Sequence, residues 1–320
     1  MEKARNPAQI IGTAIMITII PTKPLAFKSP SVITPLYITS NPQSSFSPFP
    51  FPFLTSPRLK FSHRRRRSFQ VQASSLVLPL LPFPIDQVLV PSEGKTLHLY
   101  EARYIALLEE SLFQKNKLFV HFVLDPIGIT GSSGEASFAA RFGCLVIIEK
   151  VERLDIGALV EIRGVGRVKI LELKQGQPYL TGEVAPLQDN VLHKMTEISS
   201  KISELKQALH SLTILEIKLK TPGEALLQTQ TVSSLNWAEK QLPLESITDF
   251  IPPVAERVSF VALQPISGAT LSELAKLQRE KLAAMDIRDT IERLDKSIEL
   301  TKHNISMSAA KLAIQSLDKR

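Results

Sequence analysis

The sequence predicts an α+β fold, with an N-terminal β-rich, barrel-like lobe that contains one inserted helix, then an α-helical bundle and a long C-terminal helix. Two observations predict this fold. Residues 74–189 hold short apolar runs separated by glycine and proline, a pattern typical of strands and turns. After Asp189 the apolar residues recur at helical spacing in longer runs. We expect four parts: a leader over 1–73, the β-rich lobe over 74–189, a helical lobe over 190–264, and the long helix over 265–320.

The leader is unlike the rest of the chain. Residues 1–73 hold ten Lys/Arg, ten of the 22 prolines and a single acid, Glu2. This acid-poor, hydroxyl-rich composition predicts a transit peptide, and the sequence around Ala73 resembles a chloroplast processing site. We therefore expect delivery to the chloroplast stroma, with translation starting at Met1 or at Met16. A disordered tail or a basic patch for nucleic acid is the alternative.

The body of the chain argues against nucleic acid and membrane partners. Residues 74–320 carry 28 basic and 30 acidic side chains, so the excess of positive charge belongs to the leader. The apolar run over 10–20 is about half of the roughly twenty residues that a spanning helix needs. We expect no nucleic-acid partner and no membrane span.

The β-rich lobe is expected to begin with an edge strand within 75–91, because Pro79, Pro82 and Pro84 cannot donate hydrogen bonds to a ladder. The helical spacing of Tyr100, Tyr104 and Leu107 then predicts the inserted helix over 99–114. A Gly/Ser loop is expected over 128–139. The remaining apolar runs predict strands over 117–125, 142–154, 158–163, 166–173 and 179–185.

Helices are expected over 191–220, 232–244 and 252–264, with Trp237 in the core. The stretch 270–305 contains neither glycine nor proline, and Thr270 and Glu273 fit a capping box. The apolar spacing of Ile287, Ile291, Leu294 and Ile298 fits either a coiled-coil seam or an ordinary bundle helix. A coiled coil would make residues 270–305 the contact of a homo-oligomer.

Gly94-Lys95-Thr96 resembles the end of a phosphate-binding P-loop, but the rest of that motif is missing. A P-loop needs a glycine at the position of Leu89 and free amides in the loop, where this chain has Pro91. We therefore expect a turn at the entry of a strand and no nucleotide.

No catalytic, cofactor-binding or metal-binding residues are predicted, and no cofactor is expected. The six histidines form no H-x-x-x-H pair, and Cys144, the only cysteine, lies in an apolar run that favours a buried structural thiol. Gly164-Val165-Gly166 lacks the third glycine of a dinucleotide fingerprint and is expected to form a tight turn between strands. His121 lies among strand residues and is expected to be half-buried with its hydrogen bonds satisfied.

Three blocks of the chain carry a family resemblance: the run from Leu78 to Pro82, the pair Val90-Pro91, and the run Leu-His-Leu-Tyr-Glu-Ala-Arg-Tyr over 97–104. In this order they resemble the opening of the N-terminal, substrate-binding domain of Lon proteases. Phe142 to Glu149 and Ile162 to Ile170 resemble later strands of that domain, so that the likeness covers roughly 76–264. Ala102 stands where the family usually has proline.

The resemblance implies a non-catalytic LON-domain protein of plant chloroplasts that binds unfolded or specific client proteins, as an adaptor or substrate-recognition factor for proteolysis. A plastid protease is an expected partner. We expect neither the ATPase nor the Ser-Lys peptidase module of a Lon protease, because no Walker motif occurs and only 56 residues follow residue 264. The alternatives are a component of a Lon-type protease completed by partner subunits, and a structural oligomerisation protein. Tyr100, Arg103 and Tyr104 are the candidate residues of a peptide-binding groove.

Overall fold

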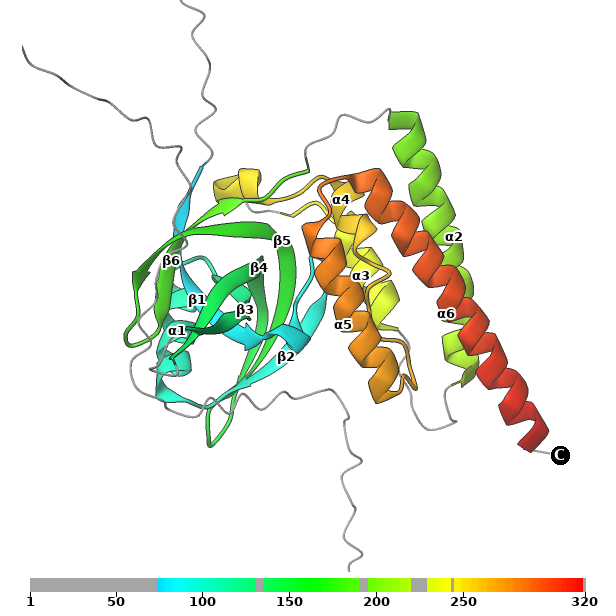
Figure 1. Ribbon diagram of the computed structural model, residues 1–320, viewed down its shortest axis with the longest axis horizontal. Coiled ribbons are helices and arrows are strands. Elements are labelled where there is room, and N and C mark those ends of the chain that lie inside the picture. The colour runs from blue at the N-terminus through cyan, green and yellow to red at the C-terminus, as the bar shows by residue number, and fades with distance from the viewer. Residues whose placement is uncertain (1–73, 131–134, 190–194, 220–228, 243–244, 319–320) are drawn as a thin grey trace, which may run out of the picture. The chain divides into compact units, whose positions relative to one another are not determined.

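Six strands of the computed structural model form one sheet that closes on itself (Figure 1). The structure describes residues 74–130, 135–189, 195–219, 229–242 and 245–318. The strands run in the order β2-β5-β4-β3-β1-β6, and β6 pairs again with β5, which closes five of them into a barrel. Only the β1–β3 pair is parallel. The bounds are β1 Leu76–Pro84, β2 Gly94–Leu99, β3 Leu118–Thr130, β4 Glu135–Arg153, β5 Ala158–Gln175 and β6 Leu180–Pro186.

β1 accommodates its three prolines although it is not an edge strand of the sheet. Residues 76–80 pair with β6, whereas residues 80–84 pair with β3 on the other side. Each half of β1 therefore pairs along only one side, and a residue without an N–H is tolerated where its unpaired side lies. The prediction of an edge strand is wrong for β1 as a whole, because β1 lies between β3 and β6. Each half of β1 nevertheless has one unpaired side, as an edge strand does.

The Gly164-Val165-Gly166 turn is a wrong prediction, because β5 runs through it without a break. The ladder with β4 shifts register here, which leaves Val165 as the extra residue of a bulge. The glycines are needed for close approach. A Cβ on Gly164 would lie 2.4 Å from the carbonyl oxygen of Val90, and one on Gly166 would lie 2.6 Å from that of Phe250.

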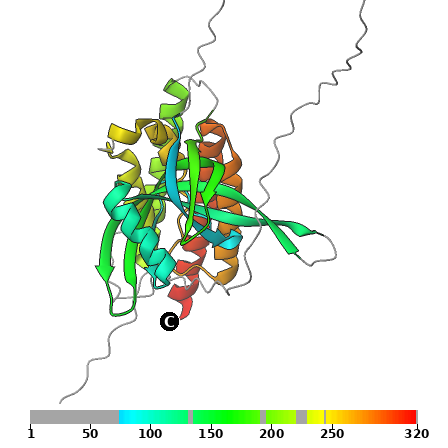
Figure 2. The same cartoon turned by 90° about the vertical axis from the view of Figure 1, so that its left-hand side faces the viewer.

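The β3–β4 hairpin is longer than expected, and Figure 2 shows it projecting beyond the other strands. Its ladder continues to the pair Thr130 and Glu135, so most of the loop expected over 128–139 is strand. The inserted helix is confirmed as α1, Ala102–Gln114, and it places Tyr104, Leu107 and Leu108 in the core of the lobe.

The remaining helices lie beside the sheet in Figure 1. A short 3-10 turn, η1 (Ile85–Gln87), links β1 to the loop before β2, and a second one, η2 (Glu245–Phe250), precedes α4. Trp237 is buried in α3, as expected. The bounds are α2 Met195–Leu219, α3 Gln230–Glu239, α4 Val254–Ser259, α5 Leu271–Asp286 and α6 Thr290–Asp318.

The uninterrupted helix expected over 270–305 is two helices, α5 and α6, separated at residues 287–289. Two interactions explain the break. Asp289 Oδ1 accepts the backbone N–H groups of Ile291 and Glu292, which makes Asp289 the N-cap of α6. The carbonyl groups at the end of α5 bind two arginine side chains described below. The capping box of Thr270 and Glu273 at the start of α5 is confirmed.

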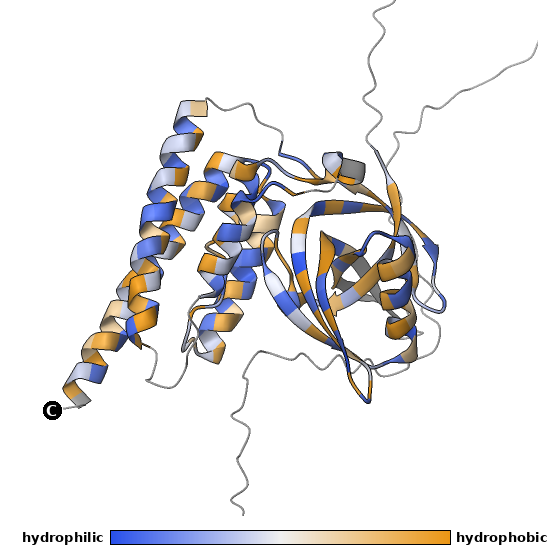
Figure 3. Cartoon of the chain, turned by 180° about the vertical axis from the view of Figure 1, so that it is seen from behind, coloured by the Kyte–Doolittle hydropathy of each residue, from blue (hydrophilic) through white to orange (hydrophobic). Residues whose placement is uncertain are grey.

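α6 lies alongside α2 and runs in the same direction, as the ion pairs Lys201–Asp295 and Lys302–Glu204 indicate. Leu294 and Ile298 of the expected coiled-coil seam are buried in a cluster with Leu205 and other residues of α2 and α4. Figure 3 shows apolar and polar residues alternating along both helices. This part of the seam packs within one chain, as in a bundle helix.

Candidate functional site: a groove beside strand β2

A cavity of about 570 Å³, called the groove below, lies between the barrel and the helices. The barrel side is formed by η1, the loop before β2, and parts of β2, β4 and β5. The opposite side is formed by α3, α5 and the segment between α4 and α5. The lining side chains used below are Gln87, Glu93, Lys95, Arg163, Gln264, Gln278 and Lys281.

One ion pair crosses the groove from the barrel to α5. Lys281 Nζ lies 2.6 Å from Glu93 Oε1, and the two side chains are only 2% and 10% exposed. The second carboxylate oxygen, Glu93 Oε2, accepts the backbone N–H of Val90 at 3.1 Å. Both oxygens of Glu93 are thus bonded, and the buried charge of Lys281 has its partner.

Lys95 of β2 lies in the same wall, with its ammonium group 5.1 Å from the ring centre of Phe83. Burial lowers the pKa of Lys95 to about 8; the nearby Lys281 charge acts in the same direction, while Glu93 and Asp86 oppose it. Within the part of the chain that the structure describes, no carboxylate forms an ion pair with Lys95. Its charge is balanced without direct contact, by the nearby carboxylates of Glu93 and Asp86.

Three glutamine side chains in the groove carry atoms that are buried and lack a hydrogen-bond partner in the described residues. These atoms are Gln87 Oε1, Gln264 Nε2 and Gln278 Oε1. An unpaired buried amide costs free energy, so native proteins normally satisfy such groups with protein, water or ligand. Because an amide both donates and accepts, the three side chains suit a ligand with both kinds of group, such as a peptide backbone.

β2 contributes a free strand edge to the groove. Among the described strands, β2 pairs only with β5, over residues 94–99. Gly94, Lys95 and Thr96 at its start line the cavity. In an antiparallel ladder, alternate residues direct their N–H and C=O groups away from the paired neighbour. Such an edge can accept an extended peptide as an additional strand.

Arg163 of β5 closes one side of the groove by linking the sheet to α3. Its guanidinium donates to Glu149 at 3.2 Å, to the carbonyl oxygen of Ser92 at 3.3 Å, and to Ser233 Oγ of α3 at 3.4 Å. Arg163 and Glu149 form an ion pair, so this cation of the groove already has a partner.

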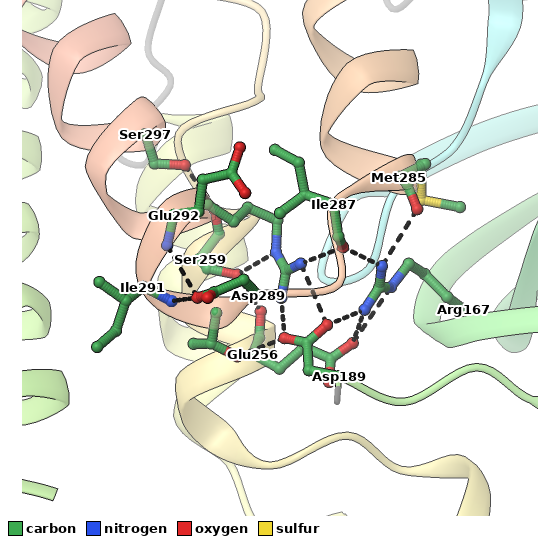
Figure 4. A network of polar contacts seen from close by, with 12 residues as sticks. Arg167, Asp189, Glu256, Ser259, Met285, Ile287, Asp289, Ile291, Glu292 and Ser297 are labelled. Atoms are coloured by element: carbon green, nitrogen blue, oxygen red, sulfur yellow. Dashed lines mark hydrogen bonds and ion pairs between the residues drawn. The ribbon is translucent and has the colours of Figure 1, made fainter. Parts of the chain in front are cut away.

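A buried network of charges holds α5 and α6 against the sheet (Figure 4). Arg167 of β5 donates to Glu256 Oε1 of α4 at 2.8 Å and to Asp189, which follows β6. Arg293 of α6 donates to Asp189 Oδ2 at 2.6 Å. Thr290 at the start of α6 donates its hydroxyl to the same carboxylate.

The two arginines also bind the end of α5. Arg167 donates to the carbonyl oxygens of Met285 at 3.1 Å and Ile287 at 2.6 Å, and Arg293 donates to that of Ile287 at 2.8 Å. Helix C-termini expose carbonyl groups that need donors, and cations are favoured there. The network therefore positions the end of α5 and, through this helix, the Lys281 wall of the groove.

The two carboxyl groups of the network differ in their pKa. Burial alone would raise the pKa of Asp189, but its bonds and proximity to Arg293, together with the Thr290 hydroxyl, bring it below the usual range. Burial raises the pKa of Glu256, and Arg167 only partly opposes this effect. Glu256 therefore depends on Arg167 for much of the stabilisation of its charge.

The three groove residues expected from the sequence lie elsewhere. Tyr104 is 4% exposed in the core of the barrel lobe, and burial raises the pKa of its hydroxyl to about 12. Arg103 pairs with Glu101 at 2.7 Å and stacks 4.6 Å from the Tyr104 ring centre. Tyr100 is partly buried. None of the three lines the cavity, and their role in peptide binding stays a prediction.

Sequence reasoning missed the groove residues themselves. Lys281 and Gln278 look like ordinary polar positions of an amphipathic helix, and only the folded chain brings them to Glu93. The turn expected at Gly94-Lys95-Thr96 is wrong, because these residues are the first of strand β2. They line the cavity from the edge of that strand. Among the described residues, no cluster suits a metal ion and no helix is long and apolar enough to cross a membrane.

The burial of Cys144 in β4 and of His121 in β3 can be compared with what the sequence predicted. Cys144 is fully buried, as expected, and burial raises the pKa of its thiol. The expectation of a half-buried, satisfied His121 is wrong. His121 is fully buried and stacks on Phe83 at 3.9 Å, and neither ring nitrogen has a partner in the described residues. Burial, with the charges of Lys95 and Lys281, holds its pKa well below the usual value, so the ring is neutral.

A closed barrel with a helical layer beside it defines this chain as an α+β domain, which comparison with known proteins identifies further. The family model of the ATP-dependent protease La (LON) substrate-binding domain matches residues 77–303. The chain belongs to this family, and membership supports a substrate-binding role. The match passes the limit near residue 264 expected from the sequence and includes α5 and part of α6, while no protease or ATPase domain is found.

The chain is also similar to parts of individual Lon proteins. A Lon protease of Nitrosococcus oceani is 30% identical over 138 residues, which are 40% of this chain and 18% of that protein. The chain thus spans less than a fifth of that relative. The N-terminal domain of a Lon protease of the Mycobacterium avium complex has a TM-score of 0.39 at 16% identity and covers 71% of this chain and 98% of its own. The Lon N-terminal domain protein of Xanthomonas campestris has a TM-score of 0.34 at 20% identity, with coverages of 69% and 96%.

Proposed function

We propose that this protein binds extended segments of other proteins in the groove beside β2 and has no peptidase activity of its own. The single observation that carries the proposal is a free strand edge next to three glutamine side chains in one cavity, each with one buried amide atom that lacks a partner in the described residues. A strand edge provides main-chain hydrogen bonds in a row, and the amide groups add bonds that do not depend on the client's sequence. Family membership supports the same role.

The first experiment measures binding of the full chain to an unfolded protein, reduced and carboxymethylated α-lactalbumin, and to the native form of the same protein. The proposal predicts binding of the unfolded form only. The double variant Gln87→Ala/Gln278→Ala should bind several-fold more weakly, because two amide groups of the groove are removed. Gln207→Ala, on the exposed face of α2, is the matched control and should bind like the unchanged protein. Equal binding by all three proteins would place the client elsewhere.

We further propose that the protein acts in the chloroplast stroma as an adaptor or substrate-recognition factor for proteolysis, with a plastid protease as its partner. The composition of residues 1–73 supports this location. Import into isolated chloroplasts should yield a shortened protein whose N-terminus lies near Ala73. Failure to import, or import without cleavage, would count against the location.

The competing functions make different predictions. A component of an ATP-dependent Lon-type protease would hydrolyse ATP or peptides when its partner subunits are added, whereas an adaptor changes only which proteins a protease degrades. A structural oligomer formed through 270–305 would lose mass in light scattering when Ile287 and Ile291, the partly buried residues of the seam, are replaced by serine. A monomer before and after that change would exclude this contact.

A further inference from the structure

The unpaired amide atoms of the groove form a pattern that one chemical group matches. Gln87 and Gln278 each leave a buried carbonyl oxygen, Oε1, without a partner in the described residues, and Gln264 leaves an amide nitrogen, Nε2. The pattern is therefore two acceptors and one donor. Because each buried polar atom is costly to leave unpaired, a ligand that bonds to all three gains the most.

The three side chains lie around one stretch of α5. Gln278 belongs to α5, and η1, which carries Gln87, packs against the same helix. Gln264 lines the groove and a second, smaller cavity, and in both of them it lies with Leu274 and Leu277 of α5. The unpaired atoms thus come from three segments that meet at α5.

The charges of the groove favour a neutral ligand. Four carboxylates and three cations line it. Each has an opposite charge nearby: Glu93 pairs with Lys281, Glu149 with Arg163 and Glu161 with Lys150, while Asp86 acts on Lys95. An additional carboxylate would enlarge the excess of negative charge, and an additional ammonium group would lie near Lys95 and Lys281. The ligand that fits is uncharged and both donates and accepts hydrogen bonds.

A primary carboxamide has the required groups. Its nitrogen donates two hydrogen bonds and its oxygen accepts, which complements two oxygens and one nitrogen. A main-chain amide has a single donor and leaves one of the two oxygens unpaired. Gln264 and Gln278 lie on the side of the groove opposite β2. A side chain of a segment that pairs with β2 must cross the groove to reach them, which favours glutamine over the shorter asparagine.

We propose that the groove selects extended protein segments that carry a glutamine, whose side-chain carboxamide binds Gln87, Gln264 and Gln278 while the adjoining main chain pairs with β2. The inference rests on the proposed function, since it names the class of segment that the same groove prefers. Segments without glutamine still bind through their main chain, but more weakly.

Five peptides that differ at one position test the proposal with the full chain. Each is acetyl-Gly-Ser-Val-Thr-Xaa-Thr-Val-Ser-Gly-amide, with Gln, Asn, Met, Glu or Lys at Xaa, and its dissociation constant is measured by isothermal titration calorimetry. The Gln peptide should bind most tightly. The Met peptide, which has a side chain of similar length without donors, should bind about tenfold more weakly, a loss typical of two neutral hydrogen bonds. The Asn peptide should be intermediate, and the Glu and Lys peptides should bind no better than the Met peptide.

Two variants assign the preference to the glutamine side chains of the protein. Gln87→Leu and Gln278→Leu each remove one acceptor, so each should weaken binding of the Gln peptide about fivefold and leave binding of the Met peptide unchanged. A disturbed fold would weaken both peptides alike, and that result would count against the proposal. Gln207→Leu, on the exposed face of α2, is the matched control and should bind both peptides like the unchanged protein.

The outcomes separate this inference from the proposed function. Equal binding of all five peptides, or tightest binding of the Met, Glu or Lys peptide, would overturn selection of glutamine and leave segment binding intact. Binding of no peptide, together with no binding of unfolded α-lactalbumin, would overturn both. If unfolded α-lactalbumin binds and none of the peptides does, the inference fails, because a glutamine within an extended segment of this length is then insufficient.

Discussion

Replacing Arg167 by methionine tests the role of the buried charge network. The guanidinium is fully buried, 2.8 Å from Glu256 Oε1 and 2.6 Å from the carbonyl oxygen of Ile287. Methionine fills part of the volume but leaves the Glu256 carboxylate without its cation. Removing one partner of a buried ion pair typically costs about 3–5 kcal/mol, because the remaining charge stays buried. The same change at Arg153, which pairs with Glu109 at an exposed site, should cost less than about 1 kcal/mol.

The assay is urea unfolding followed by the fluorescence of Trp237. It is the only tryptophan in the chain, and it is buried beside Ile247 and Phe250. Its environment changes on unfolding, so one probe reports the free energy of unfolding of each variant. Adding Glu256→Gln to Arg167→Met should recover at least about 1 kcal/mol, because the uncompensated charge is removed.

The pH dependence of the stability of Arg167→Met gives an independent test, because the direction of the change with pH can be predicted. Burial already raises the pKa of Glu256 above its value in the unfolded chain, and loss of Arg167 raises it further. The folded state then binds a proton that the unfolded state releases, so the variant loses stability as the pH rises through the raised pKa. The loss of unfolding free energy in Arg167→Met, relative to the unchanged protein, should therefore be largest at neutral to alkaline pH and should shrink on acidification. A loss as small as that of Arg153→Met, or no recovery of stability when Glu256→Gln is added, would refute the reasoning.

Three further predictions concern the packing of the chain. Leu294→Ala should lower the free energy of unfolding by about 2–5 kcal/mol, because Leu294 is fully buried between α6 and α2; a loss below 1 kcal/mol would contradict the packing. Thr270→Ala should cost about 1 kcal/mol by removing the N-cap of α5, measured by the same urea unfolding, and Thr270→Ser should restore most of it. Cys144 should react with Ellman's reagent only as fast as the protein unfolds, since the thiol is buried with a raised pKa; immediate reaction in native buffer would refute this.

The strands and helices were predictable where one local signal was decisive. The helical spacing from Tyr104 to Leu108 identified α1, and Thr270 with Glu273 identified the start of α5. The break between α5 and α6 also has a local signal, because Asp289 and Glu292 have the spacing of a capping box. The absence of glycine and proline from residues 270–305 does not by itself keep a helix continuous.

Other features depend on contacts that no local pattern reveals. Gly164 and Gly166 resemble a turn, yet they are glycine because the Val90 and Phe250 carbonyl oxygens lie against them in the folded lobe. The groove is of the same kind, since Glu93 and Lys281 are 188 positions apart. These two charged residues become the wall of a cavity only when the helices pack on the barrel.

The bonds from Arg167 to the end of α5 also bear on the order of folding. Arg167 meets its acceptor at Ile287 across 120 positions of sequence, so this bond forms only when the end of α5 has reached the barrel. The barrel strands all precede residue 187, whereas Lys281 belongs to α5. A barrel that has formed before α5 packs on it has a strand edge with no opposite wall, so the groove is complete only after α5 is in place.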